Sequence, residues 1–397
     1  MQPLLLKTFT TTTALGRGVA DTLSALRGQH SGLHSRAWET VDIPTCIGEV
    51  TGLDAVIMRA DMQAFDCRNN RLAQLALEQD SFMQCVQTCA ERYGRHRIGV
   101  FLGSSTSGIL SSEQAYRRRD PVSGSLPADH SYRHTHNMSS AADFVRQYAD
   151  LRGPAFVVST ACSSSAKVFG VAQRMIDCGI IDAAIVGGID TLCLTTLYGF
   201  NSLQLVSCHP CMPFDAERNG ISIGEGAAFI LLEGADQAQP NDILLSGIGE
   251  SSDAHHMSAP HPEGFGARLA MQGALDMAGL LPESIDYINL HGTATFSNDA
   301  AEDFAVTAVF GTTTPCSSTK GHTGHTLGAA GGVEAVICAI ALRHDFLPGG
   351  IGTQNPDPRL HCNYLLTNKN KSITNAISNS FGFGGSNCSL LFSRKLA

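Results

Sequence analysis

The sequence predicts an α/β protein, because short apolar segments ending in glycine, serine or histidine repeatedly lead into helical patterns. Such segments lie at 97–108, 155–177, 183–190, 243–254, 286–295 and 376–392. Their apolar runs are continuous rather than alternating, which is typical of strands that helices cover on both faces. The polar segment 233–242 separates two sets of these units, so we expect one half over 1–240 and a second over 241–397.

Composition narrows the class of protein. The chain has 397 residues, 43% of them hydrophobic and 16% charged, which is typical of a globular protein. A net charge of -9 argues against broad nucleic-acid binding. No apolar run reaches the ~18 residues of a membrane span, and the three leucines near the start are too few for a signal peptide. We therefore expect a cytoplasmic protein with no membrane span.

The 13 cysteines favour a reduced compartment, because their number is odd and no export signal precedes them. Two weak metal candidates are the "CHPC" motif from Cys208 to Cys211 and the cluster from His130 to His136. The motif has no second cysteine pair at zinc-site spacing, and the cluster is typical of a polar loop. We expect no metal site.

One cysteine stands at a position suited to catalysis. The stretch "VVSTACSSSAKVFG" places Cys162 between an apolar run and a helical pattern that includes Val168, Val171 and Met175. Unpaired backbone N–H groups at a helix N-terminus stabilise a thiolate, so we expect the pKa of this thiol to be lowered. Position alone leaves a buried structural cysteine as an equal alternative.

Two histidines favour the catalytic interpretation. In "INLHGTAT", His291 follows an apolar strand. In "STKGHTGHTLGAAG", Lys320 and His325 lie in a glycine-rich loop that opens a helix carrying Glu334. Open α/β sheets bind ligands at the carboxyl ends of their strands, so a thiol and two histidines at such ends suggest a single site.

These motifs, together with "NSFGFGGSN", resemble the β-ketoacyl-[acyl carrier protein] synthases of the thiolase superfamily, in the branch with a Cys-His-His site. The resemblance extends to 13–33, 212–235 and 251–260, and so covers nearly the whole chain. It implies two duplicated βαβαβ halves in a five-layered αβαβα sandwich, usually dimeric. A cysteine hydrolase, the alternative for a Cys/His pair, leaves the second histidine and the lysine unexplained.

The resemblance also implies a mechanism. Cys162 takes an acyl group from a carrier-protein thioester, and His291 and His325 act on a malonyl extender that loses CO2 and attacks the acyl-enzyme. The backbone N–H groups of Cys162 and Phe383 form the oxyanion hole, and Phe383 is the gate. The other implied roles are pantetheine binding by Thr293 and Thr295, orientation of the histidines by Lys320 and Glu334, and pairing of that lysine with Asp299 and Glu302.

The expected partner is an acidic acyl carrier protein, whose phosphopantetheine carries the substrates, so that no cofactor is needed. Basic residues that could attract it are Arg68, Arg71, Arg117, Arg118 and Arg119. The pattern "TACSSSAK" resembles polyketide-type synthases and suggests a specialised pathway, such as that of bacterial aryl polyenes. The alternative is a structural chain-length partner of low activity, although such partners lose the nucleophile. Whether the dimer is a homodimer or a heterodimer stays open.

Overall fold

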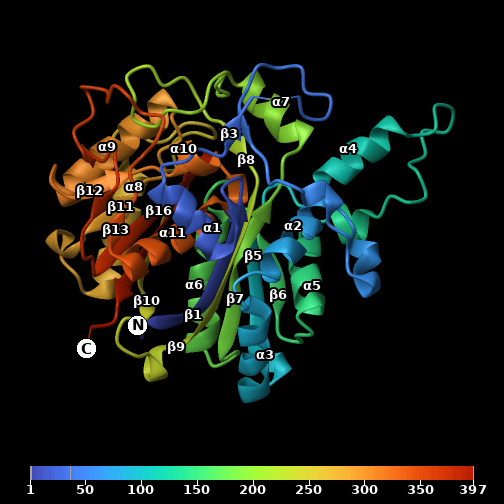
Figure 1. The fold of residues 1–397 in the computed structure, drawn as a ribbon, viewed down its shortest axis with the longest axis horizontal. Helices are drawn as coiled ribbons and strands as arrows, with labels where there is room; N and C mark the ends of the chain where they lie inside the picture. The colour runs from blue at the N-terminus through green and yellow to red at the C-terminus, as the bar shows by residue number, and fades with distance from the viewer. Residues whose placement is uncertain (1, 36, 397) are drawn as a thin grey trace.

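The computed structural model describes residues 2–35 and 37–396, which form layers of helices and strands (Figure 1). In the first half, the strands along the path of the large sheet are β1 (Leu4–Thr13), β5 (Ile98–Gly103), β6 (Ala155–Val158), β7 (Ala183–Asp190) and β9 (Gly226–Gly234). In the second half they are β10 (Ile243–Ser252), β11 (Tyr287–Asn289), β12 (Pro315–Ser317), β14 (Asn363–Tyr364), β16 (Asn375–Gly382) and β17 (Ser386–Arg394). The two sets follow similar patterns, as a duplicated α/β fold requires.

The pairing of the strands shows this duplication. In the first half, β6, β5 and β7 run parallel, and β9 and then β1 continue the sheet antiparallel. In the second half, β12, β11 and β16 run parallel, and β17 and then β10 continue it antiparallel. The halves join through a short antiparallel pairing of β1 with β10, so the strands form one connected sheet.

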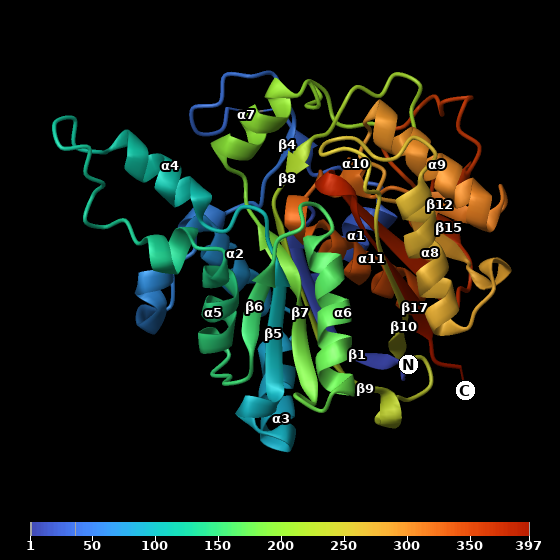
Figure 2. The same cartoon turned by 180° about the vertical axis from the view of Figure 1, so that it is seen from behind.

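Helices supply the remaining three layers. One outer layer holds α2 (Arg68–Leu77), α3 (Phe82–Tyr93) and α5 (Ser139–Tyr148), and the other holds α8 (Phe265–Ala278) and α9 (Phe296–Phe310). Between the halves lie α1 (Gly18–Arg27), α6 (Ser164–Asp177) and α11 (Ala330–His344). Figure 2 shows α6 beside β7 and the outer helices on either side. This order is the αβαβα sandwich that the resemblance implies.

The central helix α11 carries the one strongly apolar helical stretch found among residues 2–35 and 37–396. Residues Leu327–His344 are long and apolar enough to cross a membrane, but 89% of them are buried inside the protein. Every residue from Ala330 to Leu342 is buried, because α11 contacts strands of both halves. The eight residues of β7 are all buried as well, which agrees with the continuous apolar pattern of the sequence.

Helices α7 and α4 lie outside these layers. Helix α7 (Leu194–Ser202) lies above the carboxyl end of β7 (Figure 1). Helix α4 (Ile109–Arg117) and the segment 118–131 form an arm that projects from the body, on the side opposite α8 and α9 in both views. The arm returns through η4 (Tyr132–His136), a single π-helical turn.

Candidate active site

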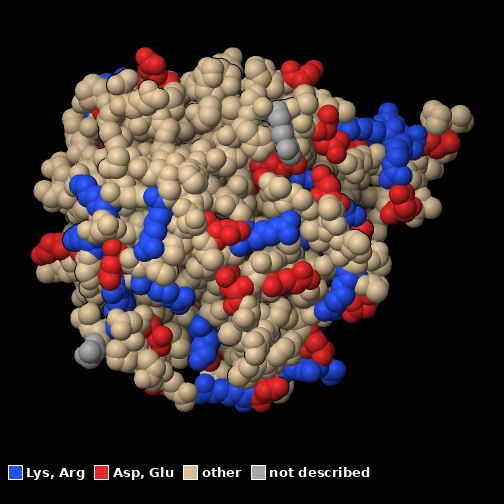
Figure 3. Space-filling view, in the orientation of Figure 1, with Lys and Arg blue, Asp and Glu red and all other residues tan. Residues whose placement is uncertain are grey.

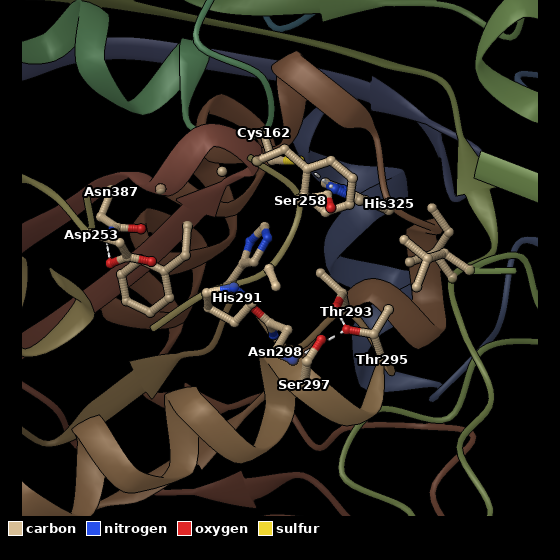
Figure 4. Close-up of a pocket in the computed structure, with 18 of the residues that line it drawn as sticks. Cys162, Asp253, Ser258, His291, Thr293, Thr295, Ser297, Asn298, His325 and Asn387 are labelled. Atoms are coloured by element: carbon tan, nitrogen blue, oxygen red, sulfur yellow. Dashed lines mark hydrogen bonds between the residues drawn. The ribbon is translucent and has the colours of Figure 1, made fainter. Parts of the chain in front are cut away.

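The thiol and the two imidazoles meet in one buried site. The Cys162 sulfur and a ring nitrogen from each of His291 and His325 all lie within 4.8 Å of one another. Cys162 follows β6, His291 follows β11, and His325 lies just after the short helix α10 (Lys320–Thr323). Figure 4 shows the three side chains facing one cavity. Segments that are far apart in the sequence therefore form a single site at the carboxyl ends of strands.

The turn before α6 presents the thiol. Ala161 has a φ of 53°, in the left-handed region that residues other than glycine seldom adopt. The Thr160 N–H donates to Ser164 Oγ at 2.9 Å, which closes the turn over the first residue of α6. Cys162 thus stands at a tight strand-to-helix junction, as the run of small residues predicted.

The charge state of the thiol differs from the prediction. Burial raises the pKa of Cys162 to about 11, although the Lys320 charge and the backbone N–H groups of Phe383 and Cys162 act in the opposite direction. The expected lowering by the helix N-terminus is therefore wrong, because desolvation outweighs the favourable dipoles. The nucleophile rests as a neutral thiol and needs a base.

His325 provides that base. Its Nε2 lies 3.0 Å from the Cys162 sulfur. Burial and the Lys320 charge hold the pKa of His325 well below its usual value, so the ring is neutral and can accept the thiol proton. Its Nδ1 has no hydrogen-bond partner among the described residues. The surroundings therefore leave this ring free to accept a proton at one stage and to donate one at another.

Lys320 fixes the orientation of the other imidazole. Its Nζ donates to the carbonyl oxygen of His291 and to the carboxylate of Glu334, and it lies 3.4 Å from His291 Nδ1. An ammonium group facing Nδ1 makes that nitrogen an acceptor, so Nε2 carries the ring hydrogen. Burial, together with the charges of Lys320 and His325, keeps the pKa of His291 well below its usual value. His291 is therefore a neutral N–H donor.

The sequence predicts that Asp299 and Glu302 pair with Lys320, but the structure gives both carboxylates other partners. Glu302 accepts the N–H groups of His291 and Gly292, both at 2.7 Å. Asp299 accepts the Phe214 N–H at 2.8 Å and the Ala294 N–H at 3.2 Å. These carboxylates hold the "HGTAT" turn by its backbone, because both lie on α9 directly behind it.

Residues 382–385, which we call the phenylalanine loop, close the site from another side. The backbone N–H groups of Phe383 and Cys162 both face the sulfur. They are placed as donors for an oxyanion that forms when the thiol attacks a carbonyl. The Phe383 ring packs against Phe200 of α7 at 5.5 Å between centroids. Gly384 and Gly385 have φ values of 80° and 71°, which glycine adopts without strain.

The cavity itself is narrow. Its volume is about 50 Å³, and Cys162, His291, His325 and Phe383 are among its lining residues. Thr293 and Thr295 also line it, and their hydroxyl oxygens lie 3.0 Å apart on the side of α9. A volume of this size holds only a few water molecules.

The predicted basic docking residues are largely neutralised. Arg68 is buried, and its guanidinium binds Glu225 at 2.6 and 2.9 Å, so it cannot serve as a surface contact. The reason is that Arg68 begins α2, whose first turn faces the interior. The other members pair with carboxylates or are exposed: Arg71 with Asp66, Arg117 with Glu39, Arg118 with Asp129, and Arg119 exposed on the arm.

The weak metal candidates have other roles. Cys211 is buried and its thiol donates to the Lys320 carbonyl oxygen at 3.3 Å, whereas Cys208 is exposed. His136 Nδ1 lies 2.6 Å from Ser112 Oγ, in the polar base of the arm. Within residues 2–35 and 37–396, the one grouping of three metal-type ligands is the Cys162, His291 and His325 set itself.

Several site residues were not predicted from the sequence. Asp253 lines the cavity, accepts the Asn387 amide at 2.8 Å, and donates its backbone N–H to the Gly385 carbonyl. Asp190 is fully buried and accepts hydrogen bonds from residues 104–106 and from the Gly328 N–H at 2.6 Å. The segment 251–260 carried a family-like pattern, but a single sequence does not show which of its side chains face a cavity.

Comparison with known proteins agrees with this geometry. The family model described as "Beta-ketoacyl synthase, N-terminal domain" matches residues 9–238, and that described as "Beta-ketoacyl synthase, C-terminal domain" matches residues 244–354. The 3-oxoacyl-[acyl-carrier-protein] synthase 2 of Coxiella burnetii is 33% identical over 96% of this chain and 95% of its own length. The mitochondrial 3-oxoacyl-[acyl-carrier-protein] synthase of Arabidopsis thaliana is 39% identical over 64% of this chain, and the match spans 59% of its length.

Solved structures similar to this chain are also ketosynthases. A chain of the ketosynthase (ApeO) in complex with its chain length factor (ApeC) from Xenorhabdus doucetiae has a TM-score of 0.90 and 40% identity, covering 99% of this chain and 98% of that one. A β-ketoacyl synthase from Burkholderia phymatum has a TM-score of 0.86 and 28% identity, with full coverage of both chains. The chain therefore belongs to the β-ketoacyl synthase family.

Proposed function

We propose that this chain is a 3-oxoacyl-[acyl carrier protein] synthase, an acyltransferase that joins an acyl group on Cys162 to a malonyl unit with loss of CO2. The observation that carries the proposal is the meeting of a thiol and two neutral imidazoles within 4.8 Å. The relatives named as 3-oxoacyl-[acyl-carrier-protein] synthases support it. No metal or organic cofactor takes part in this chemistry.

In the first half-reaction, the Cys162 sulfur attacks the carbonyl carbon of an acyl thioester. His325 accepts the thiol proton at Nε2, 3.0 Å away, and passes it to the departing carrier thiol. The N–H groups of Cys162 and Phe383 stabilise the tetrahedral oxyanion. The products are the acyl-enzyme and the free carrier thiol, so the site returns to its neutral state.

In the second half-reaction, malonyl thioester loses CO2 and its thioester carbonyl becomes an enolate. His291 Nε2–H and the His325 ring donate hydrogen bonds to that oxygen. The electron pair then forms a carbon–carbon bond to the acyl carbonyl carbon, and the Cys162 sulfur leaves as a thiolate, which takes up one proton from solvent to become the neutral thiol again. The product is a 3-oxoacyl thioester that is two carbons longer. Lys320 sustains this step because it fixes the hydrogen on His291 Nε2.

A second ketosynthase-like chain is the proposed partner. Strand β6 ends the sheet, and all four of its residues are half-buried, so its open edge is suited to pairing with another chain. The similarity to a ketosynthase–chain length factor complex supports a heterodimer, and the homodimer is the alternative. This chain retains the thiol and both imidazoles, which favours the catalytic member over the structural one.

The pathway is proposed to be polyketide-like and specialised, of the kind that makes aryl polyenes. Support comes from the "TACSSSAK" pattern and from 40% identity, over 99% of this chain, to a chain of the Xenorhabdus complex. We place the reaction in the cytoplasm. All 13 cysteines are free, which agrees with a reducing compartment.

The test follows each half-reaction by intact mass. The protein is incubated with a panel of acyl-carrier thioesters, and malonyl-carrier is then added. We expect an acyl adduct on the wild type but not on Cys162→Ala, followed by a 3-oxo product. His291→Ala is the matched variant, because it should still be acylated but should release CO2 slowly. An adduct that survives in Cys162→Ala contradicts the assignment of the nucleophile. An adduct that forms only with a co-expressed partner identifies an obligate heterodimer.

A further inference from the structure

Three cysteines that the catalytic mechanism does not use lie close together. Cys46 and Cys211 are buried and belong to the same small apolar cluster. The Cys46 thiol donates to the Cys208 carbonyl oxygen at 4.0 Å, and the Cys211 thiol donates to the Lys320 carbonyl oxygen at 3.3 Å. Two of these cysteines are the ends of the "CHPC" motif. The motif therefore lies between a third cysteine and the backbone of a catalytic-site residue.

The sulfurs of Cys46 and Cys208 are close enough to influence each other. Burial raises the pKa of the Cys46 thiol, and the charge of Cys208 raises it further. Cys208 is exposed, so its side chain changes rotamer rapidly. A disulfide needs Cα atoms about 4.4–6.8 Å apart. A Cys46 sulfur that already contacts the backbone of Cys208 is compatible with that range.

Cys208 is the member of this group that an oxidant in solution reaches first. Of the 13 cysteines, all of which lie among the described residues, Cys178 and Cys208 are exposed. Oxidants select thiols by exposure and by thiolate fraction. Cys46 and Cys211 are buried, and burial raises the pKa values of Cys211 and Cys162 to about 11. The first oxidation step within the group is therefore expected at Cys208.

Cys46 is better placed than Cys211 to react with an oxidised Cys208. The Cys211 thiol is directed at the Lys320 carbonyl oxygen, and the Cys211 N–H donates to Ser222 Oγ at 3.0 Å. These two contacts hold Cys211 toward the interior. The Cys46 thiol, in contrast, is directed at the backbone of Cys208.

The segment that carries Cys208 indicates which oxidant fits. Residues 191–214, which include α7 and the loop after it, contain no lysine, arginine, aspartate or glutamate. Figure 3 shows the upper part of the molecule, where α7 lies in Figure 1, as mostly uncharged. The segment offers no cation that would bind an anionic oxidant such as glutathione disulfide. A small uncharged hydroperoxide fits this surface better.

The Cys46 side of the pair supports the catalytic base. Cys46 directly precedes β4 (Ile47–Gly48), which pairs in parallel with β8 (Ile223–Gly224). The Gly224 N–H donates to the His325 carbonyl oxygen at 3.0 Å. A displacement of β4 is therefore transmitted through β8 to His325.

The Cys208 side of the pair leads to the wall of the cavity. Leu205, three residues before Cys208, lines the cavity, and so does Ile221. The Ser207 N–H donates to the Ile221 carbonyl oxygen at 2.8 Å. A covalent bond from Cys208 to Cys46 therefore joins the cavity wall to the strand that supports the base.

We propose that Cys46 and Cys208 form a reversible disulfide and that this bond slows the synthase; the second part rests on the proposed function. The Cys208 sulfur attacks one oxygen of hydrogen peroxide, the O–O bond breaks, and the other oxygen leaves as water. The Cys46 sulfur then attacks the sulfur of the resulting sulfenic acid, and the second oxygen leaves as water when the S–S bond forms. The two thiol protons leave in the two water molecules. The two sulfurs together lose two electrons, which reduce the peroxide.

The first measurement detects the bond itself and needs no activity. Cys162→Ala protein, which lacks the catalytic thiol, is treated with hydrogen peroxide, denatured, alkylated, digested and analysed by mass spectrometry. We expect two fewer alkylated thiols and a linked pair of peptides that carry Cys46 and Cys208, both reversed by a dithiol reductant. With Cys46→Ser added, Cys208 should stop at the sulfenic acid, which a dimedone-type reagent traps. Cys178→Ser is the matched control, because it removes the other exposed thiol and should leave the bond in place.

A different bond would overturn the proposal. A link from Cys208 to Cys211, or from Cys316 to Cys362, without one from Cys208 to Cys46, has this result. So does a thiol count that peroxide leaves unchanged. Cys208→Ser tests the same bond at an exposed position, so it does not depend on how the core tolerates Cys46→Ser.

The second measurement is the rate at which a carrier thioester acylates Cys162. We expect the oxidised wild type to be slower by about tenfold or more, because small displacements of a catalytic group are costly, and reduction should restore the rate. Cys208→Ser, oxidised in the same way, should keep its rate, and any loss in this variant measures direct oxidation of Cys162. Equal rates for the reduced and the disulfide-bonded wild type overturn the slowing effect. No acylation of the reduced wild type would instead refute the proposed function, while the thiol count still tests the bond.

Discussion

Lys320 is a buried cation beside both imidazoles, and its replacement should alter how the site responds to pH. In Lys320→Met the ammonium that faces His291 Nδ1 at 3.4 Å is lost. With an effective dielectric constant of about 20, a proton on that imidazole is disfavoured by about 5 kcal/mol through the lysine charge alone. The charge of Lys320 also lowers the pKa of His325. We therefore expect the pKa of both rings to rise in the variant.

The sign of the effect on activity follows from the required state. Both imidazoles must be neutral, and in the wild type their pKa values lie well below the usual histidine value. The wild-type rate of decarboxylation should therefore stay level as the pH falls to about 6. In Lys320→Met the rate should begin to fall at a higher pH than in the wild type, because the imidazoles take up protons there; we call this fall the acid limb of the pH profile. The rate at neutral pH should fall about 10²- to 10³-fold, because the hydrogen on His291 Nε2 is no longer fixed.

The assay measures CO2 release from malonyl-carrier by the acylated enzyme across the pH range, for the wild type, Lys320→Met and Lys320→Arg. The arginine variant keeps the charge, so it should lose rate without gaining the acid limb. Glu334 should not remain as an unpaired charge in Lys320→Met. Burial already raises its pKa to about 7 despite the lysine, so it takes up a proton. Coincident acid limbs for Lys320→Met and the wild type would refute this electrostatic reasoning.

Three further predictions follow from the same contacts. Alkylation of Cys162 by iodoacetamide should be slow at neutral pH and should rise steeply toward its pKa of about 11, whereas rapid labelling at neutral pH would contradict the neutral thiol. Asp190→Asn should move that alkylation curve to lower pH, because the buried Asp190 charge raises the pKa of the thiol, and an unmoved curve would remove this electrostatic role. Glu302→Ala should lower the free energy of unfolding, measured in denaturant, by about 2–5 kcal/mol, since it leaves the buried N–H groups of His291 and Gly292 unpaired. Glu302→Gln should lower it less. Equal losses in the two variants would show that the backbone hydrogen bonds are not the cause.

Much of the site could be predicted from the sequence because it depends on local pattern. Continuous apolar strands lead into small-residue turns, and such turns lie at the carboxyl ends of strands in any α/β sheet. That rule places Cys162, His291 and His325 at the same edge, and the structure shows them there. The contact between Lys320 and Glu334 could likewise be predicted, because both residues lie in the continuous segment that runs from α10 into α11.

Features that depend on burial could not be predicted in this way. Arg68 is a surface residue by type, but folding places Glu225, from a segment far along the chain, against its guanidinium. Glu302 and Asp299 lie near Lys320 in the family pattern, but which donors they meet depends on the turn that α9 abuts. Contacts between distant segments decide each case, and a single sequence carries no direct signal of them.

The difference between the predicted and the observed direction of the Cys162 pKa shift identifies what drives the first step. The helix N-terminus and Lys320 both favour a thiolate, but burial outweighs them. The attack must therefore coincide with transfer of the proton to His325. The N–H groups of Cys162 and Phe383 favour this step because they stabilise the negative charge that develops on the substrate carbonyl oxygen. The thiol therefore stays unreactive until a thioester carbonyl reaches the two N–H groups.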